Sequence, residues 1–348
     1  MFWFSYYILF YFYTAGHLTR QKEKNMNRKL RLPAFVFLLT FSLLAIVQIK
    51  LDRPMILAER FFEGAGWIEI VFISLYGAIV AYKMQDPANV PQWRKVTWTI
   101  FSVIFFSQLI VGLSGFEKFL MSGKLHLPIP MMILGGPVYR GQLSVMTILF
   151  LSTVILTGPA WCSHLCYFGA FDNIASSGKT SRDVLKYKTA IKSTILIIVI
   201  GMALILRWIN VPLLIATYIA AAFGLMGIGI MILISRKRKK MFHCVMYCPV
   251  GTIVNITKSV NPFRMYIDTS CTLCMLCTKY CKYDALDTAD IKNGKPSITC
   301  TLCGDCLAGC HHNSIKYKFL ALEPAKARFL YLLLTISLHA SCIALARI

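Results

Sequence analysis

The chain has 348 residues and a net charge of +22, and 57% of its residues are hydrophobic. A protein of this length with a mean hydropathy of +0.62 is too apolar to be soluble and requires membrane-spanning segments. Its basic residues lie at the ends of apolar segments, so membrane topology explains the charge, and nucleic-acid binding is not expected.

Residues 1–32 precede the first predicted membrane helix, and two interpretations of this N-terminal segment are open. Residues 1–16 are aromatic and apolar, but they are short for a membrane span and lack the charged region and cleavage site of a signal peptide. In the alternative, translation begins at Met26 and the preceding residues are a mis-assigned start.

A transmembrane domain is predicted at residues 33–261, and a further membrane helix is predicted within residues 320–348. Apolar segments of spanning length lie at 33–49, 66–82, 96–114, 143–160, 189–206, 213–234 and 329–346. The predicted fold is mainly α: a polytopic membrane bundle of six to seven transmembrane helices with a small α+β two-cluster ferredoxin-like domain. Residues 115–142 are apolar but broken by proline and glycine, so we expect a membrane-surface or re-entrant loop there.

Lys and Arg residues are unequally distributed between the two sets of loops. The loops on one side of the predicted membrane carry 18 of them, whereas the opposite loops carry 7. The side richer in Lys and Arg is expected to be cytoplasmic. We therefore expect a multi-pass protein of the bacterial cytoplasmic (inner) membrane, with the ferredoxin-like domain facing the cytoplasm.

Two cysteine pairs follow the fourth and the sixth predicted helices in similar sequence contexts. Cys162 and Cys166 lie in WCSHLCYFG, and Cys244 and Cys248 lie in HCVMYCPVG, at a constant offset of 82 residues. The alignment indicates a duplicated unit, and duplicated membrane units commonly build one site between their copies. The i, i+4 spacing on a helix would place both thiols of a pair on one face.

These four cysteines, hereafter the four repeat cysteines, predict a shared redox or metal site at the cytoplasmic membrane surface. A third cluster, another metal or a dithiol/disulfide pair would fit it, and Trp161, His164 and His243 would lie nearby as hydrogen-bond donors to sulfur. The alternative is that the cysteines are buried structural thiols. A haem is not expected, because His339 is the only histidine in a predicted span and has no partner there.

Residues 262–319 carry two C-x2-C-x2-C-x3-C runs, each typical of a [4Fe–4S] cluster. In a two-cluster ferredoxin the fourth cysteine of each run ligates the other cluster. The predicted ligand sets are Cys271, Cys274, Cys277 and Cys310 for one cluster, and Cys300, Cys303, Cys306 and Cys281 for the other. Zinc and disulfides are less favoured, because zinc sites use pairs with a longer spacer and disulfides require an oxidising compartment.

Paired C-x3-C motifs after membrane helices, followed by the tandem cluster motif, resemble those of the polyferredoxin membrane proteins. That family includes the NapH-type quinol dehydrogenase subunit and the membrane part of NosR-type proteins. The resemblance covers about residues 33–319. The chain departs from the pattern at Tyr167, where the family has proline, in its seventh helix, and in having no room for a flavin-bearing domain before the first helix.

The resemblance implies an electron-transfer subunit of an oxidoreductase of quinol dehydrogenase type. Such a protein would relay electrons between the quinone pool, or a membrane partner, and a redox partner protein or reductase subunit, through two [4Fe–4S] clusters. The alternative, implied by a related family, is a thiol-based copper reductase or assembly factor for a respiratory oxidase. A membrane redox sensor is a third hypothesis. No catalytic residue is predicted, since no nucleotide-binding glycine loop or catalytic triad pattern is present.

Overall fold

The computed structural model describes residues 29–51, 54–119, 129–143, 145–178, 180 and 183–345. The two interpretations of the N-terminal segment, including a start at Met26, concern residues that lie almost wholly outside this part of the chain.

Seven helices of the described residues are long and apolar enough to cross a membrane, which confirms the predicted fold class. They are Lys29–Lys50, α3 (Gly66–Met84), α4 (Val90–Leu113), α6 (Val145–Thr157, continued by turns to Leu165), α8 (Lys188–Trp208), α9 (Leu213–Ile230, continued to Arg238) and α13 (Pro324–Leu345). Each corresponds to one of the apolar segments predicted from hydropathy.

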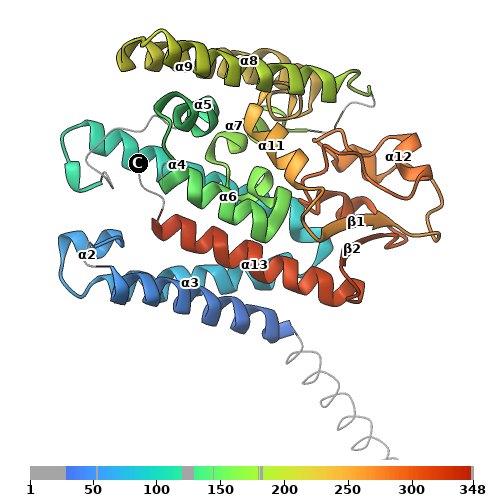
Figure 1. Ribbon diagram of the computed structural model, residues 1–348. Helices are drawn as coiled ribbons and strands as arrows, with labels where there is room; N and C mark the ends of the chain where they lie inside the picture. The colour runs from blue at the N-terminus through green and yellow to red at the C-terminus, as the bar shows by residue number, and fades with distance from the viewer. Residues whose placement is uncertain are drawn as a thin grey trace, which may run out of the picture.

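The bundle places α6 and α13 in its centre, while α8 and α9 lie together along one edge (Figure 1). On the other side, α13 packs against α3. Small residues allow this approach, because a Cβ added at Gly77 would lie 3.4 Å from the Cβ of Ala340. The central position of α13 explains why the last helix carries many buried residues, as expected for a membrane helix surrounded by other helices.

The segment between the third and fourth membrane helices differs from the expected loop. Residues Pro130–Arg140 form the helix α5, which packs against α8, α9 and α11 (Pro249–Thr257), so the expectation of a loop was wrong for these residues. Pro130 occupies the first helical position, where its missing N–H costs nothing. Gly141 ends the helix with φ of 69°. The neighbouring helices bury α5, which compensates for Pro137 in its interior.

A small α+β unit lies at one end of the bundle, beyond the start of α13 (Figure 1). Its antiparallel strands are β1 (Phe263–Ile267) and β2 (Ile315–Phe319), paired so that Phe263 lies opposite Phe319 and Ile267 opposite Ile315. The short helix α12 (Thr288–Lys292) begins with a capping box formed by Asp287 and Asp290. One face of the sheet is buried, and the ring of Tyr317 packs 4.8 Å from that of Tyr331 on α13.

The remaining helices are α2 (Leu57–Phe61), α7 (Tyr167–Ala175) and α10 (Arg236–Arg238). The helices α7 and α11 occupy equivalent places in the predicted repeat. Each has nine residues and each follows a five-residue π-helical turn. The duplication inferred from sequence is therefore present in the backbone.

Candidate metal centres

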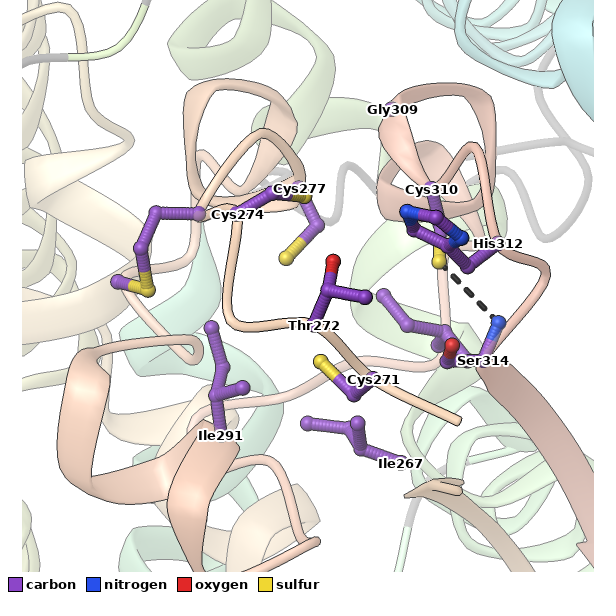
Figure 2. A pocket seen from close by; sticks show the side chains of 12 residues that line it. Ile267, Cys271, Thr272, Cys274, Cys277, Ile291, Gly309, Cys310, His312 and Ser314 are labelled. Atoms are coloured by element: carbon purple, nitrogen blue, oxygen red, sulfur yellow. Dashed lines mark hydrogen bonds between the residues drawn. The ribbon is translucent and has the colours of Figure 1, made fainter. Parts of the chain in front are cut away.

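The first cysteine set, Cys271, Cys274, Cys277 and Cys310, lines one small cavity of the α+β unit. Figure 2 shows the side chains of Cys271, Cys277 and Cys310 around a common central space, with Ser314 beside Cys310. The backbone N–H of Ser314 donates to Sγ of Cys310 at 3.2 Å. Burial, together with the neighbouring thiolates of Cys310, Cys271 and Cys274, raises the pKa of Cys277 to about 11.

The second cysteine set, Cys281, Cys300, Cys303 and Cys306, lines a second cavity. Here the N–H of Ala285 donates to Sγ of Cys281 at 3.3 Å, as Ser314 does for Cys310 in the first set. Burial raises the pKa of Cys306 well above its ordinary value, and the other three members, together with Cys277, raise it further. The structure thus brings together the same two groups of four that the sequence predicted as ligand sets.

The two loops that carry these sets have matching backbone strain. Leu273 and Leu302 have φ of 56° and 57°, and the equivalent positions two residues later, Met275 and Gly304, have φ of 57° and 82°. Side chains other than glycine rarely adopt this left-handed conformation, and such residues gather at functional sites. The strain allows each loop to curl so that three cysteines close together in sequence face one cavity.

The donor sets fit a cluster better than a single ion. Among the described residues, no three His, Cys, Asp or Glu side chains form a group suited to one metal ion. Zinc requires four ligands at about 2.3 Å for sulfur, whereas a cubane cluster separates its four cysteine sulfurs more widely. The raised pKa values mean that a bound metal must displace thiol protons, as is usual for cysteine sites.

The two C-x3-C motifs form nearly identical turns, the first repeat turn (Trp161–Leu165) and the second repeat turn (His243–Tyr247). In both, the N–H of the second cysteine donates to the carbonyl oxygen five residues earlier, and both distances are 2.9 Å. Cys166 and Cys248 then take extended conformations and become the N-caps of α7 and α11. The expected placement on one α-helical face was wrong, because a π-helical turn has a different period.

The turns nevertheless bring the four repeat cysteines close together. Burial raises the pKa of Cys244 well above its ordinary value, and Asp172, Cys248, Cys166 and Cys162 raise it further. Burial likewise raises the pKa of Cys166 to about 12, with Cys248 as the next cause. The N–H of Gly169 donates to Sγ of Cys166 at 3.4 Å. Helix N-termini therefore face two of the four sulfurs, a position that stabilises thiolates.

Three buried ring nitrogens on two side chains in this region lack hydrogen-bond partners among the described residues. Trp161 and His243 are equivalent residues, each directly before the first cysteine of its pair. Trp161 Nε1 and both ring nitrogens of His243 form no hydrogen bond with the described part of the protein. Buried polar groups without partners are rare and call for an explanation such as an absent ligand. Both are thus available as donors to sulfur, as the sequence suggested.

The surroundings of His164 and His339 differ from those expected. The first repeat turn extends the membrane helix, so His164 lies in a spanning segment, and its carbonyl oxygen accepts a hydrogen bond from Nδ1 of His339 at 2.9 Å. The expectation that His339 is the only histidine in a spanning segment was therefore wrong. Tyr76 bonds Nε2 of His339 at 3.1 Å, so both of its nitrogens are engaged. Nδ1 of His164 bonds Oγ of Ser163 rather than sulfur.

Three contacts join the repeat turns to the second cysteine set. Arg94 on α4 forms a buried ion pair with Asp305, which lies between Cys303 and Cys306, and its Nη1 donates to the carbonyl oxygen of Ser163 in the first repeat turn at 3.3 Å. Ser163 donates to the carbonyl oxygen of Thr301 at 3.1 Å. In addition, Cys244, Cys281 and Cys303 border one hydrophobic cluster around Trp98 and Tyr283. The four repeat cysteines and the second set are therefore neighbours in space.

Sequence reasoning missed several residues of this region: Arg94, Asp172, Lys192 and Tyr283. Lys192 alone had a usable signal, because it lies inside a predicted span, where an ionisable residue indicates function. The others become neighbours of the cysteines only through the fold.

The comparisons with known proteins agree with this location. The model of a family described as a 4Fe-4S binding domain matches residues 142–183 and residues 220–259. These two segments are the two copies of the repeat, whereas the runs between Cys271 and Cys310 lie outside both matches. No curated protein and no solved structure matches the chain. The chain is thus a membrane-associated, multi-pass iron–sulfur protein of ferredoxin type that functions in electron transport.

Proposed function

We propose that this protein relays electrons between the membrane and a redox partner protein through three cysteine-ligated centres. The observation that carries the proposal is the spatial order of the three sets of four cysteines. The four repeat cysteines lie at the ends of membrane helices, the second set adjoins them, and the first set lies next, with Cys274 exposed. In this proposal the first and second sets each bind a [4Fe–4S] cluster.

The chain's own residues hold and insulate these centres. A cluster, when bound, accepts and releases one electron at a time. The backbone N–H groups of Ser314 and Ala285 donate to cysteine sulfurs, and such hydrogen bonds together with burial tune reduction potentials. Cys306 of the second set is 8% exposed, which keeps water from the middle of the relay. The exposed Cys274 and His312 mark the surface where a redox partner or reductase subunit would dock.

At the membrane end we propose the quinone pool or a membrane partner as electron donor or acceptor, in line with the NapH/NosR-type resemblance. The orientation follows the basic loops. Asp284 of the α+β unit pairs with Lys188, the first residue of α8, and with Lys240, which follows the membrane span of α9. Burial alone would raise the pKa of Asp284, but these lysines and the N–H of Leu185 hold it below its ordinary value. The α+β unit thus lies on the Lys-rich side, which we assign to the cytoplasm of a bacterial inner membrane.

The alternative of a copper reductase or assembly factor requires copper to reach the four repeat cysteines. Cys248 is 7% exposed, and the repeat cysteines pack against hydrophobic clusters. Apolar surroundings and the burial of Cys248 suit a relay better than a site that must admit a metal substrate, so we favour the first function.

The test is iron analysis and redox-titrated EPR on protein purified anaerobically, with and without a quinol analogue. We expect about eight irons per chain for the two ferredoxin-type clusters, and about twelve if the repeat site also holds a cubane. Reduction of the clusters by the quinol analogue would support the membrane donor. Stoichiometric zinc in place of iron would contradict the proposal, and a reporter fused after Lys240 that behaves as extracytoplasmic would contradict the orientation.

A further inference from the structure

A buried lysine lies beside the four repeat cysteines. Lys192 is one turn inside α8 and is 4% exposed. Its Nζ lies 2.7 Å from the position that a Cβ would take at Gly251. Gly251 is in the first turn of α11, three residues after Cys248 at the N-cap. The absence of a side chain at residue 251 therefore makes room for the ammonium group next to this turn.

The charge of Lys192 has no carboxylate partner among the described residues. The ion pairs found there join other lysines and arginines to acids, including Lys188 and Lys240 to Asp284. The acidic groups within electrostatic range of the Lys192 ammonium are the thiols of Cys162, Cys248 and Cys244. A buried charge without a counter-charge is costly. Protonated thiols are neutral and would leave the buried charge of Lys192 unpaired, whereas thiolates that bind a metal centre would supply the missing negative charge.

The first copy of the repeat shows that packing alone does not require a lysine. There the equivalent position beside Gly169 is occupied by Trp98, whose ring atom Cζ2 lies 2.7 Å from the Cβ position at Gly169. The indole Nε1 donates to the carbonyl oxygen of Cys166 at 2.7 Å. The two copies share a backbone, but the helix beside the first copy, α4, supplies a neutral ring, whereas the helix beside the second, α8, supplies a positive charge. Both side chains fill the space beside a glycine, so Lys192 differs from Trp98 in its charge rather than in this packing role.

We propose that Lys192 is the counter-ion of an anionic iron–sulfur centre held by the four repeat cysteines, and that it raises the reduction potential of this centre. The inference rests on the proposed function, since it requires these cysteines to bind a centre. Adding one electron makes the centre more negative by one charge, and a fixed ammonium nearby stabilises the reduced form more than the oxidised form. Lys192 is thus a positioning and tuning residue that contributes no ligand.

The experiment compares three variants of the full-length protein by redox-titrated EPR. Lys192→Met removes the charge at similar length, Lys192→Arg keeps it, and Lys237→Met removes an exposed charge from the same side of the membrane as a control. We expect Lys192→Met to lower the reduction potential of the repeat centre. At a fixed ambient potential, the ratio of oxidised to reduced centre should rise at least tenfold, which corresponds to a fall in potential of about 59 mV for a one-electron couple. In Lys192→Arg and Lys237→Met, the repeat centre should keep a reduction potential near that of the wild type. The two ferredoxin-type clusters should keep their wild-type potentials in all three variants.

An unchanged potential in Lys192→Met, with the third signal present, would overturn the role of Lys192 while leaving the relay intact. Equal falls in Lys192→Met and Lys192→Arg would also overturn it, because shape rather than charge would then be the cause. If Lys192→Met loses the third centre, retention of the centre in Lys192→Arg supports the counter-ion and loss in both contradicts it. A wild-type protein without a third signal would overturn this inference together with the membrane end of the proposed relay.

Discussion

Tyr283 donates its phenolic hydrogen bond to the carbonyl oxygen of Cys162 at 2.8 Å. Tyr283 follows Cys281 of the second cysteine set by two residues, and Cys162 lies in the first repeat turn. This side chain therefore connects the α+β unit to the membrane repeat at the point where the proposed relay passes between them.

Replacing Tyr283 with phenylalanine should weaken this connection. The ring is retained, but the carbonyl oxygen of Cys162 loses its donor, which costs about 1–3 kcal/mol when the acceptor stays buried. We expect a lower unfolding temperature in detergent and slower reduction of the two ferredoxin-type clusters by a quinol analogue, with their potentials unchanged. Tyr266→Phe, on β1 of the same unit, is the matched control. A Tyr283→Phe protein with wild-type stability and reduction rate would show that the contact is dispensable.

The assignment of crossed ligands can be tested one cysteine at a time. Cys277 lines the first cavity and Cys281 the second, although only three residues separate them in sequence. We expect Cys277→Ser to damage one EPR signal and Cys281→Ser the other, each with a loss of up to about four irons. Damage to the same signal in both variants would mean that all four cysteines of a run ligate one cluster.

The buried pair Arg94–Asp305 should be a main anchor of the α+β unit. Arg94 is 1% exposed, and its Nε donates to Oδ1 of Asp305 at 2.8 Å. Removing one partner leaves an uncompensated buried charge, so Asp305→Asn or Arg94→Met should destabilise the protein by about 3–5 kcal/mol. The double variant Arg94→Met/Asp305→Leu should recover much of that loss, because a well-packed apolar pair can replace a buried ion pair. Thermal unfolding in detergent measures both effects, and additive losses in the double variant would show that the two residues act independently.

Hydropathy and cysteine spacing predicted the parts of this molecule that local sequence determines. Seven apolar segments became seven helices, and the two runs of four cysteines sorted into the expected sets. Proline and glycine led to the prediction of a loop at residues 130–140, where the structure has the helix α5. Pro130 starts this helix, and neighbouring helices compensate for Pro137. The contacts of Arg94 with Asp305, 211 residues away, and of Tyr283 with Cys162 depend on the tertiary fold, which no local pattern reveals.

The four repeat cysteines should be needed for electron transfer but not for the two ferredoxin-type clusters. Serine at Cys162 and Cys244, separately and together, removes one thiol from each repeat turn while keeping a small polar side chain. Because the sets at the two cavities of the α+β unit are formed by other cysteines, we expect both ferredoxin-type EPR signals to persist in the double variant. Electron transfer from a quinol analogue to these clusters should fall at least tenfold, since the step nearest the membrane is lost. Cys342→Ser on α13, a partly buried thiol outside all three sets, serves as the control and should transfer electrons at the wild-type rate. Full electron transfer in the Cys162→Ser/Cys244→Ser protein would show that the repeat cysteines are structural thiols.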